Sequence, residues 1–133
     1  RDFEQALAIY ELKEGPSHPD VARPLDALAT LARKANDLDR ADALLQRVLT
    51  IKETNLGKDH PELVVSLVNL GAVQRDQKHL EESEKTLRRA VAIAEAKLDP
   101  TNRDAVNARQ LLVITLRAEG KEAEAVAIET GRP

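Results

Sequence analysis

The chain has 133 residues, no cysteine and a net charge of −3, with positive and negative side chains interspersed along its whole length. The absence of thiols excludes disulfides and thiolate metal sites, and the absence of a basic stripe argues against nucleic-acid binding. No apolar run approaches the roughly 20 residues that a membrane-spanning helix requires. We therefore expect a cytoplasmic protein with no membrane span.

Apolar residues recur with helical period along the chain, and strong helix formers dominate the composition. The pattern predicts no strand and seven helices, over residues 2–14, 19–34, 38–55, 61–76, 80–98, 102–118 and 121–129. Short polar turns, "KAND", "DQKH" and "AEGK", join helices in pairs. The predicted fold class is all-α, a stack of antiparallel helical hairpins.

The sequence repeats with a period of 42 residues. "GPSHPDVARPLDALATLAR" from Gly15 aligns with "GKDHPELVVSLVNLGAVQR" from Gly57, and a third copy starts near Asp99. We expect a single array over residues 1–133. Its units would be 1–14 (the second helix of a truncated repeat), 15–56, 57–98 and 99–133.

Two histidines, His18 and His60, come directly before the proline that opens a predicted helix. Proline is favoured at the first helical position, and an acid beside it complements the positive helix end. A metal site would need two or three further ligands at the same place, and the third copy has Asn102 in place of histidine. The pattern therefore favours a structural role for both histidines, in the turn.

These residues resemble the tetratricopeptide repeat family, in the 42-residue variety found in kinesin light chains. The likeness lies in "DHPELVVSLVNLGAV" and "HLEESEKTLRRAVAIAEAKL". In the first helix of a hairpin it includes a leucine followed by a small residue, at Leu28-Ala29 and Leu70-Gly71. In the second helix it includes a small residue, at Ala41, Ser83 and Ala125, and a bulky residue four positions later, at Leu45 and Leu87. The resemblance implies a right-handed α-solenoid of about three repeats plus a leading half-repeat, and a non-catalytic protein-binding role.

The chain departs from the family pattern at several positions. Leu25, Leu67 and Arg109 stand where the family often has a large aromatic residue, which predicts an aliphatic core. Pro24 lies inside a predicted helix and should bend or delay it.

Charged residues also replace leucines in the last copy, at Arg109, Glu122 and Glu129. Terminal repeats need a polar outer face, so residues 99–133 are interpreted as a C-terminal cap, with ordinary drift before further copies as the alternative. At the other end, Phe3 and Leu7 lack a packing partner, from which we expect the natural protein to continue upstream, and hypothesise self-association through the N-terminal half-repeat.

No catalytic motif is present. The sequence has neither a phosphate-cradling glycine loop nor a His-Glu-x-x-His pattern, and Ser17, Ser66 and Ser83 have no plausible histidine partner. We expect no enzyme activity, no cofactor and no metal.

Three arginines, Arg33, Arg75 and Arg117, recur at the end of the first helix of each hairpin. The family resemblance places first helices on the concave surface, where these guanidinium groups would bind an acidic peptide or a chain terminus. Asn69 and Gln110 are further candidate contacts for the peptide.

A second interpretation of the arginines stays open. Asp20, Glu62 and Asp104 lie at the opposite end of the same helices, and acids at helix starts with arginines at helix ends are what helix dipoles favour. For the whole chain we expect a protein-protein interaction module that binds a partner segment in the concave groove. The alternative is an assembly module whose repeat ends stack chain on chain.

Overall fold

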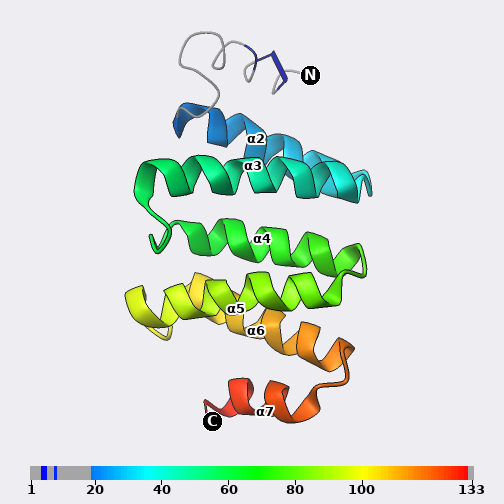
Figure 1. The fold of residues 1–133 in the computed structure, drawn as a ribbon, viewed down its shortest axis with the longest axis vertical. Coiled ribbons are helices and arrows are strands. Elements are labelled where there is room, and N and C mark those ends of the chain that lie inside the picture. The colour runs from blue at the N-terminus through cyan, green and yellow to red at the C-terminus, as the bar shows by residue number, and fades with distance from the viewer. Residues whose placement is uncertain (1–3, 6–7, 9–18, 132–133) are drawn as a thin grey trace.

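The computed structural model describes residues 4, 5, 8 and 19–131. Residues 19–131 form helices without any strand: Pro19–Lys34 (α2), Leu38–Leu56 (α3), Leu63–Asp76 (α4), Leu80–Lys97 (α5), Arg103–Ala118 (α6) and Glu122–Thr130 (α7). Each helix packs against the next one along the chain, and α4 also packs against α6. Figure 1 shows the resulting stack of helices along the long axis, which is the expected all-α solenoid of hairpins.

The N-terminal predictions fall mostly outside the described residues. Of the helix predicted over 2–14, only residues 4, 5 and 8 are described, and these three are helical. Phe3 and Leu7, on which the self-association hypothesis depends, lie outside the described residues, and so does His18.

One helix starts later than the sequence predicts. The helix expected from residue 61 begins at Leu63, because the backbone first forms a tight turn in which Leu63 N donates to His60 O at 3.0 Å and Val64 N to Pro61 O at 3.1 Å. Hydrogen bonds with this three-residue spacing are common where a helix is about to begin. Pro61 therefore lies in the turn and not in the helix.

The first helix of each hairpin ends in the same way. Asn36 and Lys78 have positive φ values of 61° and 69°, and Gly120, at the equivalent position, has a φ of 80°. The residue after each of them donates its N–H back across the turn, as Lys121 N does to Leu116 O at 2.8 Å. This left-handed closure is a Schellman motif, and it sets the angle at which the second helix returns.

Pro24 does not delay the helix that contains it. The helix α2 starts at Pro19 and continues through Pro24, whose ring is buried. Pro24 is the sixth residue of α2, so its missing N–H removes one internal hydrogen bond near the start of the helix, and the helix continues despite that loss. The predicted delay was therefore wrong.

The core is aliphatic, as the sequence predicts. Leu25 and Leu67, which replace the family's aromatic residue, are fully buried. The small residues are needed for close packing: a Cβ atom on Gly71 would lie 2.6 Å from Cγ of Leu87, and Ser83 Oγ donates to Gly71 O at 2.8 Å. The helices α4 and α5 therefore approach each other closely at this point.

Ion pairs join the second helices of successive hairpins. Arg89 of α5 donates to Glu53 of α3 at 2.5 Å, and Arg88 of α5 donates to Glu124 of α7 at 2.7 Å. Arg89 also donates to Lys58 O at 2.9 Å, so it holds the loop between α3 and α4. The two ion pairs connect each repeat with its neighbour.

Candidate functional site

Three hollows lie side by side along the first helices α2, α4 and α6. Their volumes are about 430, 330 and 450 Å³. Arg33 and Asn69 line both the first and the middle hollow, and Gln110 and Ile114 line both the middle and the third. The three hollows therefore form one continuous surface depression, which we call the groove.

The groove brings most of the candidate site residues together. Arg33, Asn69, Arg75 and Gln110 all line the middle hollow, although they come from three different helices. Arg117 lies in the third hollow, beside Gln110. The repeat spacing thus places equivalent side chains next to one another in space.

The first arginine is held by an acid from the next repeat. Arg33 Nε donates to Asp76 Oδ2 at 3.0 Å, while Asp76 Oδ1 lies 3.9 Å from Arg75 Nη2. The two terminal nitrogens of Arg33 make no hydrogen bond within the described part of the chain. Asp76 therefore orients Arg33 and leaves the outer edge of its guanidinium group open.

Arg75 is the least constrained of the three arginines. Its side chain is 27% exposed and makes no hydrogen bond to the residues that the structure describes, the long contact with Asp76 being its one ion pair there. The position equivalent to Asp76 in the following repeat is Ala118. Arg75 consequently lacks the acid from the next repeat that Arg33 has.

Arg117, by contrast, is fully engaged by two glutamates of α7. Its Nε lies 3.1 Å and 3.2 Å from the two oxygens of Glu122, and its terminal nitrogens donate to Glu129 at 3.1 Å and 2.8 Å. Glu129, and after it Glu122, raise the pKa of Arg117, and Arg117 in turn lowers the pKa of Glu129. The two glutamates that the sequence suggests as a polar end face are therefore partners of Arg117.

Apolar and amide side chains complete the middle hollow. Ile114 is 48% exposed, and Val68 and Leu111 are half-buried beside it. Asn107, which the sequence did not single out, adds an amide to those of Asn69 and Gln110. The position of Asn107 one helical turn before Gln110 on α6 is the signal that would have identified it.

The histidine turn has a structural explanation. His60 Nδ1 accepts a hydrogen bond from Glu62 N at 3.1 Å, and at the equivalent position Asn102 Oδ1 accepts from Asp104 N at 2.8 Å. Asparagine is a preferred residue at this capping position. The structural role predicted for His60 is confirmed, and within the described ranges no group of three His, Asp or Glu side chains is arranged to hold a metal ion.

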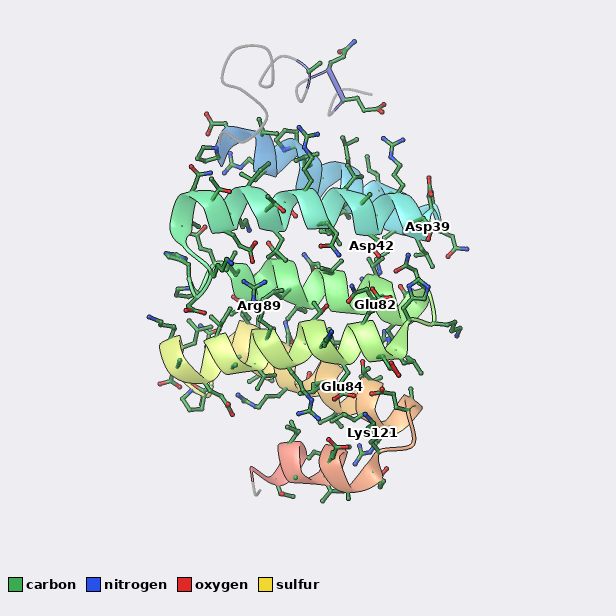
Figure 2. The ribbon with its side chains drawn as sticks, viewed as in Figure 1. Asp39, Asp42, Glu82, Glu84, Arg89 and Lys121 are labelled. Carbon is green, nitrogen blue, oxygen red and sulfur yellow. The ribbon has the colours of Figure 1, made fainter. Side chains whose placement is uncertain are left out.

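A second charged cluster surrounds the turn between α6 and α7. Glu84 accepts hydrogen bonds from Lys121 at 2.8 Å and from Arg88 at 2.6 Å, which lower its pKa to about 2. Figure 2 shows Glu84 and Lys121 together where α5 meets this turn. Burial, and then the neighbouring Glu84, raise the pKa of Glu119, whose side chain is 8% exposed.

Acids at helix starts and arginines at helix ends also occur as predicted. Asp20 lies in the first turn of α2 and Asp104 in that of α6, while Arg33, Arg75 and Arg117 lie in the last turns of their helices. Glu62 directly precedes α4. Stabilisation of helix ends therefore accounts for part of the pattern whether or not the arginines also bind a ligand.

A stack of helical hairpins around an aliphatic core, with a groove along its first helices, defines an α-solenoid repeat protein. The family model for the tetratricopeptide repeat matches residues 1–54 and 62–130, and the chain belongs to this family. Repeats of this family are generally non-catalytic protein-interaction modules. None of the helices in the part of the chain that is described is long and apolar enough to cross a membrane.

Solved structures of other repeat proteins have the same fold. Kinesin light chain TPR-like repeats from Podosopora anserina are 24% identical, with a TM-score of 0.86, over 95% of this chain and 60% of that one. BtubC (BKLC) from P. vanneervenii is 21% identical, with a TM-score of 0.87, over 95% of this chain and 50% of that one. The chain thus spans half to three fifths of the length of these relatives, and no curated protein sequence matches it.

Proposed function

We propose that the chain is a non-catalytic interaction module whose groove binds a segment of a partner protein with acidic side chains or a terminal carboxylate. The observation that carries the proposal is the convergence of Arg33, Arg75, Asn69 and Gln110 around one hollow of about 330 Å³. These residues come from three repeats, so the sequence distance between them is large while the spatial distance is small.

The charge balance at the middle hollow favours an anionic ligand. Arg33 and Arg75 contribute two positive charges, and Asp76 offsets one of them. Arg75 makes only the long contact with Asp76 within the described residues, and its planar guanidinium group matches the geometry of a carboxylate. A hydrogen bond to a charged group contributes roughly 1.5–3 kcal/mol, so Arg75 alone would change affinity by about tenfold or more.

The other side chains in the hollow suit an extended peptide. The amides of Asn69, Asn107 and Gln110 both donate and accept, as pairing with a peptide backbone requires. Val68, Leu111 and Ile114 offer apolar contact between the polar groups. The packed repeats hold these groups in place before binding, which reduces the ordering cost on the side of the module.

Arg117 has a smaller role in this proposal than the other two arginines. A ligand carboxylate would have to displace Glu122 or Glu129, whose hydrogen bonds already occupy its donors. We therefore expect the strongest charge contacts with the ligand at Arg75 and at the open edge of Arg33.

Fluorescence anisotropy with an array of labelled synthetic peptides tests the proposal. Peptides of about twelve residues, in which glutamates and leucines are permuted, are long enough to cross the groove at about 3.3 Å per residue. Acidic peptides should bind better than their glutamine counterparts, and Arg75→Glu should weaken binding at least tenfold.

Lys85→Glu is the matched control for this experiment. It makes the same change in charge at an exposed position of α5, outside the groove lining. Equal binding of acidic and glutamine peptides, or equal losses from Arg75→Glu and Lys85→Glu, would contradict groove binding.

A further inference from the structure

One carboxylate in the groove has no partner. Asp26 of α2 lines the first hollow together with Asn69 of α4. Among the residues that the structure describes, its carboxylate makes neither a hydrogen bond nor an ion pair, and only its backbone oxygen is engaged, by Thr30 Oγ1 at 3.1 Å. Asp76 and Glu129, the acids beside the groove arginines, are both paired.

The environment of Asp26 penalises its charge. Its side chain is half-buried, and this burial raises its pKa, against an opposing effect of the Lys52 charge. Within the described residues Lys52 makes no ion pair with Asp26, and its Nζ donates instead to Ser66 Oγ at 2.9 Å. A carboxylate that has lost part of its hydration without gaining a partner is stabilised by any cation that reaches it.

Asp26 also distinguishes the α2 end of the groove from the rest. The equivalent positions in the next two repeats are Val68 and Gln110. Arginine, by contrast, is kept at the end of the first helix in all three repeats, as Arg33, Arg75 and Arg117. The groove therefore presents an acid at α2, an apolar group at α4 and an amide at α6.

Two cations, Arg33 and Lys34, also line the first hollow, so they must be weighed against this acid. They lie seven and eight residues further along the same helix, which is roughly 10–12 Å at 1.5 Å per residue. That separation is about one Debye length in physiological salt. Arg33 is in addition partly neutralised by Asp76. The repulsion that they exert on a cation at Asp26 is consequently screened.

We propose that Asp26 receives a lysine or arginine side chain of the bound segment and so fixes the direction in which that segment crosses the groove. This inference rests on the proposed function, because it assigns a second charge contact to the same ligand. Neighbouring first helices lie roughly 10 Å apart. Arg75 is the counterpart of Arg33 in the next repeat, so it also lies roughly 10 Å further along the helix direction than Asp26. The basic residue of the ligand therefore lies roughly 14 Å, or about four residues, from the acid that reaches Arg75.

A double-mutant cycle tests the contact. The probes are two labelled peptides that share a Glu-Leu-Glu core and differ, about four residues away, in a lysine or its uncharged analogue norleucine. On the wild-type chain the lysine peptide should bind about fivefold more tightly, which is the upper end of what an ion pair in contact with solvent contributes. On Asp26→Asn the two peptides should bind equally.

Asp59→Asn is the control, since it removes the same charge from an exposed loop residue and should keep the fivefold difference. A carbon-13 titration of the Asp26 carboxyl group gives a second measurement, in which the lysine peptide should lower the pKa of Asp26 and the norleucine peptide should not.

The outcomes separate the two proposals. If both peptides bind the wild type equally and still depend on Arg75, the Asp26 contact is wrong while groove binding stands. If neither peptide binds, nor any other acidic peptide, both proposals fall. A fivefold preference that persists in Asp26→Asn would place the basic contact on another residue and overturn this inference.

Discussion

Arg33 Nε donates a hydrogen bond to Asp76 Oδ2 at 3.0 Å, across 43 positions of the sequence. The pair connects the end of α2 with the end of α4, and Asp76 Oδ1 also lies 3.9 Å from Arg75 Nη2. Asp76 thus has two effects on the groove: it orients one arginine and partly neutralises two.

The first prediction concerns this carboxylate. Asp76→Asn keeps a hydrogen-bond acceptor for Arg33 but removes a negative charge from the site. At a separation of about 6 Å in water, one charge changes the binding energy of an anionic ligand by roughly 0.7 kcal/mol. Acidic peptides should therefore bind about threefold more tightly in anisotropy titrations at low salt, and the gain should shrink as salt is added.

Stability provides the check on that variant. An exposed ion pair contributes roughly 0–1 kcal/mol, so Asp76→Asn should unfold in urea within that range of the wild type. A weaker affinity for acidic peptides, at unchanged stability, would mean that orienting Arg33 matters more than the charge.

The second prediction concerns the contact between α4 and α5. Gly71→Ala places a methyl group 2.6 Å from Cγ of the buried Leu87, so the helices must separate or Leu87 must change rotamer. Overpacking of this kind costs typically 1–3 kcal/mol. Urea denaturation followed by circular dichroism measures it. Combining Gly71→Ala with Leu87→Ala should cost less than the sum of the single changes, and strict additivity would count against the clash.

The third prediction concerns the turns that end the first helices. Lys78 occupies a left-handed conformation that costs a non-glycine residue roughly 1–2 kcal/mol, while the equivalent Gly120 occupies it without that cost. Lys78→Gly should accordingly raise the free energy of unfolding by about 1 kcal/mol, and Gly120→Ala should lower it by a similar amount. Thermal or urea unfolding of the two variants beside the wild type decides the matter. A lower free energy of unfolding for Lys78→Gly, or a higher one for Gly120→Ala, would refute the shared motif.

The fourth prediction concerns pH. The pKa of Glu119 is raised above 4.5 in the folded chain, chiefly by burial, and one of its buried oxygens has no partner among the residues described. A raised pKa stabilises the folded state below the unfolded value and loses that contribution as pH rises through the folded value. Stability should therefore fall as pH increases from about 4.5 through the pKa of Glu119.

Glu119→Gln should remove that decrease, because a neutral amide is not penalised by burial in this way. The equivalent residue of the preceding repeat is already Gln77, whose Nε2 donates to Asp39 at 2.8 Å. Glu84 works in the opposite direction: its pKa of about 2 means that its stabilisation is lost as pH falls from 4.5 toward 2. Urea midpoints measured across this range in wild type and Glu119→Gln separate the two effects.

Much of this architecture follows from local sequence pattern. Periodic leucines and alanines define the helices, and the spacing of 42 residues is enough to place Arg33 and Arg75 beside each other. The small residue at Gly71 predicts a close helix contact, which Leu87 provides. Such features depend on residues that recur at fixed intervals, which a single sequence displays directly.

Side-chain pairs between residues that do not recur in each repeat could not be predicted from the sequence. Asp76 has no counterpart acid in the following repeat, and Glu122 and Glu129 could be assigned to Arg117 only once the angle between α6 and α7 was known. Asp26 appeared as one acid among many on a charged helix surface. Its place beside Asn69 in the first hollow depends on how the hairpins stack, and that geometry is set by side chains distant in sequence.

The helix contacts also bear on how the chain would respond to a pulling force. Within the described residues, the helices that pack together are neighbours along the chain or, for α4 and α6, first helices of adjacent hairpins. No tertiary contact therefore clamps one end of the stack to the other. When the chain is pulled from its two ends, its hairpins should therefore unfold one after another, and its length should increase in a series of small steps.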